Sequence, residues 1–160
     1  MSAGQATIPV TEPNAVAYDF DFRSWHFYWL ARVDRSYLSN LEPALQRHDL
    51  DIASWRVLMI LHVRQIDSVS DLADHSITKL STMTRIVQRM SKDGLVICAP
   101  NEDDRRITMV RITEKGELAG KTAWSEASRI ANRAFEGFSP AEKRQLVTLL
   151  KRLDSNLTNR

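Results

Sequence analysis

The sequence has few of the features that mark secreted, metal-binding or membrane proteins. Among its 160 residues is a single cysteine, Cys98, which excludes an internal disulfide and a zinc site built from several cysteines. No apolar run approaches the ~20 residues that a membrane-spanning helix needs. The first seventeen residues contain no lysine, arginine or continuous apolar segment, so they do not form a secretory signal. We therefore expect a cytoplasmic protein with no membrane partner.

Residues that would support catalysis or metal binding are also scarce. The five glycines form no phosphate-binding loop, and the chain has no nucleophile motif and no pair of carboxylates at a defined spacing. Its histidines, at positions 26, 48, 62 and 75, lack the spacing of metal ligands. We expect no enzymatic activity, no metal and no cofactor.

The net charge is small, only +2, which excludes a general polycation. Any affinity for nucleic acid must therefore come from a local basic patch. Such a patch lies at residues 78–92, where Lys79, Arg85, Arg89 and Lys92 occur without one acidic residue.

The same stretch has the pattern of an amphipathic helix. Apolar residues recur along one face at three- and four-residue spacing: Leu80, Met83, Ile86, Val87 and Met90. The other face carries hydroxyl, amide and guanidinium groups, on Ser81, Thr82, Thr84, Arg85, Gln88 and Arg89. These groups suit phosphates and the base edges of the major groove, so we predict a recognition helix. The simpler alternative is a solvated basic face.

The residues around this helix predict a wing and two supporting helices. Gly94 is placed as a left-handed C-cap, and two apolar runs at 95–98 and 107–112 enclose a polar loop at 101–106. Asp51 is placed to cap a helix over residues 52–63, and residues 70–75 form a short helix before the recognition helix. The fold class is therefore mainly α with a small β wing, a winged helix-turn-helix over residues 50–112.

Both ends of the chain predict long helices with apolar stripes. Seven of the twelve aromatic residues lie between Tyr18 and Trp29, and helical spacing runs from about residue 23 to 47. Thr113 caps a helix, and Ser139-Pro140-Ala141-Glu142 begins another with a capping box. One winged domain cannot cover these stripes, so we expect residues 18–47 and 113–157 to form a homodimer. Residues 18–157 would then be a single domain preceded by a flexible arm, residues 1–17.

The order and spacing of several motifs resembles the MarR family of bacterial transcriptional regulators. The residues that carry the resemblance are Ser54-Trp55-Arg56-Val57-Leu58, Leu72-Ala73-Asp74, the run from Ser81 to Met90, Gly94-Leu95-Val96, Asp103-Asp104-Arg105-Arg106 and Ile112-Thr113-Glu114-Lys115-Gly116. The resemblance implies a homodimer whose two recognition helices enter successive major grooves of a pseudo-palindromic operator.

The resemblance also gives the wing a function, with two departures. The family's Asp-x-Arg falls on Asp104 and Arg106, which implies that Arg106 enters the minor groove beside Arg105. Lys79 stands where the family often has an acid that holds this arginine, so either Asp103 or Asp104 holds Arg106 instead, or Arg106 is more loosely held. Ile77 replaces the family's turn glycine.

Family members commonly respond to small aromatic acids, and two helices offer suitable contacts. These are Trp25, His26, Trp29 and Arg32 on the first helix, and Trp55, Met59 and His62 on the second. A ring would lie on the indoles and a carboxylate on Arg32 or His26. The alternative is that the aromatic stripe is dimer core and that Arg32 pairs with an acid of the second subunit.

We expect Cys98 to be a buried structural thiol at the base of the wing rather than a redox sensor. The sequence thus predicts a repressor of transcription that binds double-stranded DNA and is released by a small aromatic or phenolic acid or its thioester. The alternative is a winged-helix adapter that binds protein and no specific DNA.

Overall fold

The computed structural model describes residues 21–158 and divides into two compact units, Met1–Asp34 and Arg35–Arg160, each of which is treated by itself. The predicted arm, residues 1–17, and the first aromatic residues of the N-terminal cluster, Tyr18 and Phe20, lie outside the described residues. No helix over the described part of the chain is long and apolar enough to cross a membrane.

The described part of the first unit is a local aromatic cluster. A 3-10 turn, η1 (Phe22–Ser24), precedes helix α1 (His26–Gln46), which begins in this unit and ends in the next. The ring of Tyr28 meets Phe22 and Trp29 edge to face, with centroids 5.1 and 5.3 Å apart. The Trp29 indole N–H donates to the Arg23 carbonyl over 2.7 Å. These contacts between near neighbours in sequence fix the start of α1.

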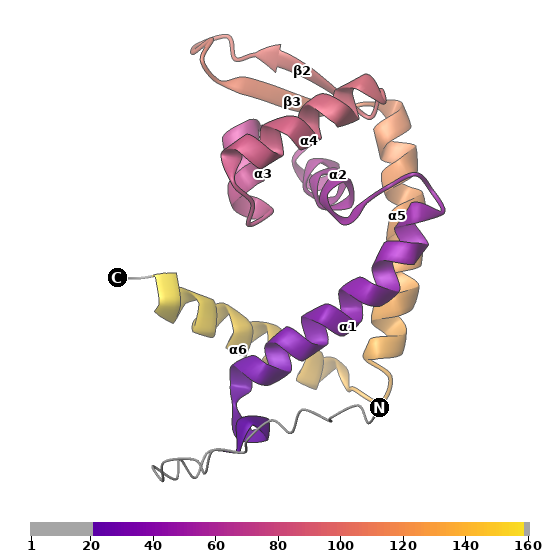
Figure 1. Ribbon diagram of the computed structural model, residues 1–160, viewed down its shortest axis with the longest axis vertical. Helices are drawn as coiled ribbons and strands as arrows, with labels where there is room; N and C mark the ends of the chain where they lie inside the picture. The colour runs from indigo at the N-terminus through magenta and orange to yellow at the C-terminus, as the bar shows by residue number, and fades with distance from the viewer. Residues whose placement is uncertain (1–20, 159–160) are drawn as a thin grey trace, which may run out of the picture. The chain divides into compact units, whose positions relative to one another are not determined.

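The second unit contains the end of α1 and all later elements (Figure 1). In chain order these are α2 (Ile52–Arg64), β1 (Ile66–Ser68), α3 (Val69–His75), α4 (Leu80–Lys92), β2 (Val96–Pro100), β3 (Thr108–Ile112), α5 (Glu114–Ala134) and α6 (Pro140–Thr158). The strands form one antiparallel sheet in the order β1-β3-β2. The predicted class, mainly α with a small β wing, is confirmed.

The core of this unit lies around α2. Its fully buried side chains include Leu41 and Leu45 of α1, Val57, Leu58 and Leu61 of α2, Met83, Val87 and Met90 of α4, and Val96 and Val110 of the sheet. The α4 residues are those of the predicted apolar stripe, and α4 packs on α3 and β2 with α2 on its inner side (Figure 1). Of the predicted stripe, Met83, Ile86, Val87 and Met90 are buried and Leu80 is 56% exposed, and this burial leaves the polar face of α4 in solvent.

Capping side chains set several helix starts. Asp51 accepts a hydrogen bond from the Ser54 amide over 2.7 Å, and Thr113 accepts one from the Gly116 amide over 3.0 Å. At α6, Ser139 and Glu142 exchange the two bonds of a capping box, as predicted. Helix α4 begins without a side-chain cap at Lys79.

The sheet differs from the prediction in two ways. A third strand, β1, pairs with β3 through Asp67 and Val110, and it was not predicted. The thiol of Cys98 is exposed, so the expectation of a buried thiol is wrong. On β2 only Val96 is buried, because the strand runs past the helical core into the wing. Partial burial raises the pKa of Cys98, although a hydrogen bond with Ser91 opposes the change.

The apolar stripe of α6 has no cover in the described chain. None of its residues is buried, and Leu146, Leu149, Leu150 and Leu157 are exposed. The monomer thus leaves uncovered an apolar face of the kind that another chain would cover.

Gly116 in the first turn of α5 is the tightest glycine site. A Cβ there would lie 2.1 Å from the carbonyl oxygen of Leu95 and 3.0 Å from Ile112 Cγ1. We expect Gly116→Ala to lower the free energy of unfolding, measured by urea denaturation, by about 1–3 kcal/mol.

Gly120→Ala, one turn later, is the matched control. Its Cβ would lie 3.7 Å from Leu58 Cβ, an ordinary contact, and alanine favours a helix over glycine by about 1 kcal/mol. Equal stability of the two variants would contradict the steric explanation.

Candidate nucleic-acid interface and adjoining cavity

The solvent face of α4 is the candidate nucleic-acid interface. Ser81, Thr82, Arg85, Gln88 and Arg89 are exposed on it, as the sequence predicted. The sixth predicted residue is half-buried: Thr84 donates its hydroxyl hydrogen to the Leu80 carbonyl over 2.9 Å. The face therefore presents hydroxyl, amide and guanidinium groups without an acid.

The wing tip is held by its own side chains. Asn101 Oδ1 accepts hydrogen bonds from the amides of Asp103 and Asp104 over 2.9 and 3.1 Å. Asp104 Oδ1 in turn accepts from the amide of Arg106 over 2.9 Å. Within residues 21–158 neither acid forms an ion pair with the Arg106 guanidinium, which agrees with the second alternative, a more loosely held Arg106. Arg105 and Arg106 are both exposed, and the turn presents their side chains to solvent.

A groove joins the recognition helix to the wing. Its volume is about 400 Å³, and its lining includes Thr84 and Gln88 of α4, Cys98 of β2, and Arg106 and Thr108 at the start of β3. The structure thus brings two predicted DNA contacts of the helix together with the predicted minor-groove arginine of the wing.

Arg89 has partners that the sequence did not indicate. Its guanidinium donates to Oδ2 of Asp51, the N-cap of α2, over 2.5 Å and to Oγ of Ser54, in the first turn of α2, over 3.1 Å. Partial burial of Asp51 opposes ionisation, but hydrogen bonds from Ser54 and the charge of Arg89 outweigh it and lower the pKa of the carboxyl. Arg89 is therefore the residue through which α4 is tied to the N-terminus of α2.

A larger cavity lies between α2 and α5. It measures about 630 Å³ and is lined by Trp55, Leu58, Met59, His62 and Val63 of α2 and by Gly120, Lys121 and Trp124 of α5. The rings of Trp55 and Trp124 stand 6.1 Å apart at 40°. Trp55 is 3% exposed, whereas Trp124 is 58% exposed, so one indole forms a fixed wall and the other a solvent-facing one. The cavity is mainly apolar, with Lys121 and His62 as its ionisable groups.

The residues predicted to share a ligand fall in different units. Trp55 and Met59 meet in the cavity of the second unit. The other four residues, Trp25, His26, Trp29 and Arg32, belong to the first unit and are exposed. There Arg32 contacts the Tyr28 hydroxyl over 3.5 Å, and their part in a ligand site stays a prediction.

Sequence analysis missed Trp124 and Lys121 of the cavity and Asp51 as the partner of Arg89. One signal was available for the cavity: Trp124 is the only aromatic residue within α5, and Gly120 lies one turn before it on the same face. A large ring one turn from a residue without a side chain indicates a hollow beside the helix. Nothing in the sequence indicated that Asp51 and Arg89 meet.

Comparison with known proteins gives the same assignment. The MarR family model matches residues 50–108. The HTH-type transcriptional repressor IacR of Pseudomonas putida is 43% identical over 140 residues, which cover 87% of this chain and 83% of that protein.

Two crystal structures share the fold. A MarR-family transcriptional regulator from Silicibacter pomeroyi has a TM-score of 0.79 at 22% identity, covering 88% of this chain and 94% of that one. NadR in complex with 4-hydroxyphenylacetate has a TM-score of 0.72 at 20% identity, covering 91% of this chain and 97% of that one. With a sequence relative of this similarity and the matching fold, the chain belongs to the MarR family, whose members are DNA-binding transcriptional regulators and not enzymes.

Proposed function

We propose that the protein is a homodimeric repressor that is released from a pseudo-palindromic operator when a small aromatic acid binds between α2 and α5. The DNA-binding part of this proposal rests on one observation. The solvent face of α4 has no acidic residue, and it borders the same groove as Arg106 of the wing. The similarity to a repressor of Pseudomonas putida supports the direction of regulation.

On DNA, the α4 face would enter the major groove and the wing the adjacent minor groove. Arg85 and Gln88 have the geometry for base edges, the first for guanine and the second for adenine. Ser81, Thr82 and Thr84 would contact phosphates or bases, and Arg105 the phosphate backbone. Arg106, next to the fixed wing turn, is suited to a narrow A·T-rich minor groove.

Two copies are needed because one chain carries a single recognition helix. The uncovered leucines of α6 and the exposed aromatic residues at the start of α1 provide apolar area for such a dimer. Their burial would set the distance between the two recognition helices and so the spacing of the half-sites.

The effector proposal rests on the shape and chemistry of the cavity. A volume of about 630 Å³ lies within the usual range for small-molecule sites. The indoles of Trp55 and Trp124, which contact each other, give an aromatic ring a surface to pack against, and Lys121 lines the same cavity and can pair with a carboxylate. NadR, which has the same fold, is described with 4-hydroxyphenylacetate, a ligand of this class.

The first turn of α2 provides a route from the cavity to the DNA. Trp55 is a cavity wall, while its neighbour Ser54 and the cap Asp51 hold Arg89 of α4. A ligand that shifts α2 therefore acts on α4 through the same turn. Release from DNA then follows if the ligand binds more tightly to the conformation in which α4 cannot engage DNA than to the conformation in which it can.

The first prediction concerns the Asp51–Arg89 pair. Both side chains are about half exposed, so a double-mutant cycle with Asp51→Asn and Arg89→Gln should give a coupling of about 0.2–1 kcal/mol at pH 7 in urea unfolding. Because folding lowers the pKa of Asp51, its charge stabilises the protein above the ordinary value of 3.8.

The coupling energy should therefore disappear as the pH falls from 3.8 through the lower pKa that Asp51 has in the folded protein. It should also shrink at high salt. A coupling that persists at low pH would mean that the charge of Asp51 does not hold Arg89.

The second prediction concerns DNA recognition. Arg85→Ala should weaken specific operator binding by about 1–3 kcal/mol, because the variant loses a base contact. Arg106→Ala should weaken binding most on operators with A·T-rich flanks. Gel-shift titrations measure both effects, and Arg144→Ala on the exposed face of α6 is the matched control.

The same titrations separate the repressor from the protein-binding adapter. Binding to random duplex DNA should fall steeply with salt, because phosphate contacts release counterions. A flat salt dependence, together with unchanged affinity of Arg85→Ala, would support the adapter instead.

The third prediction concerns the effector. With 4-hydroxyphenylacetate as the probe, Lys121→Gln should weaken binding about tenfold, the loss of one charge-assisted hydrogen bond. The corresponding amide of the probe should bind wild type and Lys121→Gln equally, whereas Trp124→Ala should weaken both compounds. Calorimetry gives these affinities, with Lys151→Gln on α6 as the control.

Arg32→Gln tests the contact predicted from sequence. A loss in Arg32→Gln with no loss in Lys121→Gln would assign the carboxylate to the first unit. Unchanged affinity in both variants and in Trp124→Ala would remove the cavity as the effector site.

A further inference from the structure

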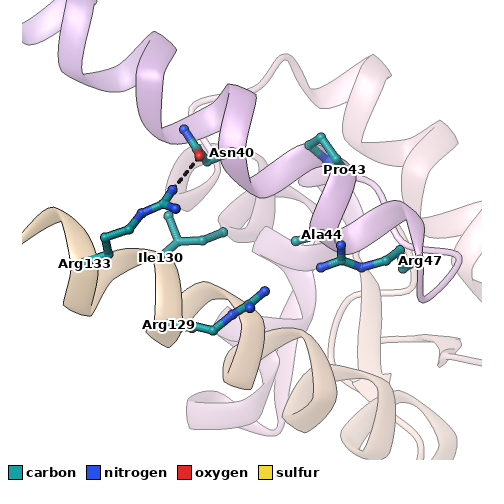
Figure 2. Close-up of a pocket in the computed structure, with 7 residues that line it drawn as sticks. All are labelled: Asn40, Pro43, Ala44, Arg47, Arg129, Ile130 and Arg133. Atoms are coloured by element: carbon teal, nitrogen blue, oxygen red, sulfur yellow. Dashed lines mark hydrogen bonds between the residues drawn. The ribbon is translucent and has the colours of Figure 1, made fainter.

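A second hollow, unlike the aromatic cavity, lies between the end of α1 and the C-terminal half of α5. It has a volume of about 350 Å³ and is lined by Asn40, Pro43 and Ala44 of α1, by Arg47 just after α1, and by Arg129, Ile130 and Arg133 of α5. Figure 2 shows Arg133 of α5 reaching across to Asn40 of α1, with Arg129 extending from α5 toward the end of the hollow where Arg47 lies. We call it the arginine cleft.

The arginine cleft has more positive than negative charge. Arg47 and Arg129 both donate to the same oxygen, Glu126 Oε2, over 3.1 and 2.6 Å. Arg133 forms no ion pair within residues 21–158 and donates to the neutral Asn40 Oδ1 over 2.6 Å. Two of the three guanidinium groups share one carboxylate and the third has none, so two positive charges are left over.

Hydrogen bonds orient the arginine side chains of the cleft but use only some of their N–H donors. Asn40 donates its amide to the Ser36 carbonyl over 2.7 Å, which turns its oxygen toward Arg133. A guanidinium has five N–H groups, and within residues 21–158 each of the three arginines uses one of its terminal nitrogens, Nη2, in the bonds described. The side chains of Arg47 and Arg129 are 60% and 71% exposed, so their other donors are open to a ligand in the hollow, whose apolar lining includes Ala44 and Ile130.

This chemistry fits an oxyanion. Planar guanidinium groups bind phosphate and carboxylate oxygens through paired hydrogen bonds, and two uncompensated charges match a dianion. The apolar floor leaves room for a small organic body. DNA phosphates are a poor fit, because the cleft is built from α1 and α5 and not from α4 or the wing.

We propose that the arginine cleft binds a small dianionic oxyanion, either a phosphate monoester or a dicarboxylate, at a site separate from the aromatic cavity. The proposal does not depend on DNA binding or on the aromatic effector. Its test therefore uses the full chain without DNA.

The test is calorimetric titration with phenyl phosphate and with succinate at constant ionic strength, with benzoate as the singly charged comparison. We expect saturable binding of a dianion at one site per chain and much weaker binding of benzoate. Tighter binding of phenyl phosphate assigns the site to phosphate monoesters, and tighter binding of succinate assigns it to dicarboxylates.

Charge variants in both directions make the test specific. Arg129→Gln and Arg133→Gln should each weaken binding about tenfold, through loss of one charge-assisted contact. Glu126→Gln should tighten it, because the variant removes the carboxylate that competes for Arg47 and Arg129. Arg144→Gln on α6 removes the same charge outside the cleft and should change nothing.

Four results would overturn the proposal. They are no saturable binding of either dianion, unchanged affinity in the cleft variants, unchanged affinity in Glu126→Gln, or loss of binding in Trp124→Ala, which would place the anion in the aromatic cavity. Sedimentation of Arg129→Gln and Arg133→Gln adds a further check. Dissociation into monomers would mean that the arginines bind acids of a second copy instead.

Discussion

The burial of α2 is the constraint on which the rest of the second unit depends. This helix contacts α3, α4, α5, β1 and β3, and its Val57, Leu58 and Leu61 are completely buried. Burying one such side chain contributes about 1.5–3 kcal/mol, so α2 cannot move without repacking its neighbours. A ligand beside Trp55 therefore acts on an element whose displacement the recognition helix must follow.

Local pairing of charges explains how a chain of net charge +2 can present a basic surface. Arg47, Arg89 and Arg129 each have an acidic partner, and these pairs lie on the supporting helices or at their junction with α4. Arg85 and Arg106 form no ion pair within residues 21–158. In addition to the arginine cleft, the outer face of α4 and the wing therefore keep positive charge without an acidic partner, and an approaching polyanion meets it there.

Features that depend on near neighbours were predictable, and those that depend on distant contacts were not. The stripe of α4 and the caps at Asp51, Thr113 and Ser139 follow from spacings of three or four residues, and the structure has them. Arg89 looked equivalent to Arg85, because both lie on the polar face of one helix. What separates them is Asp51, 38 residues earlier in the chain, which only the packing of α2 on α4 brings within reach. Strand β1 is three residues long and was missed because it pairs only through β3.

Ile77 shows that this packing also determines the turn of the helix-turn-helix. The residue has a φ of 53°, in the left-handed region that disfavours β-branched side chains, and it is 94% exposed, so no burial compensates the strain. The turn forms nevertheless, because the Thr78 amide donates to the Ala73 carbonyl over 2.9 Å while Ala73 and Met83 are buried on either side. Contact between α3 and α4 therefore imposes the conformation that a glycine would adopt freely. The angle at which α4 is presented is thus a property of the core, and a ligand that perturbs α2 acts on that angle through the core as well as through Arg89.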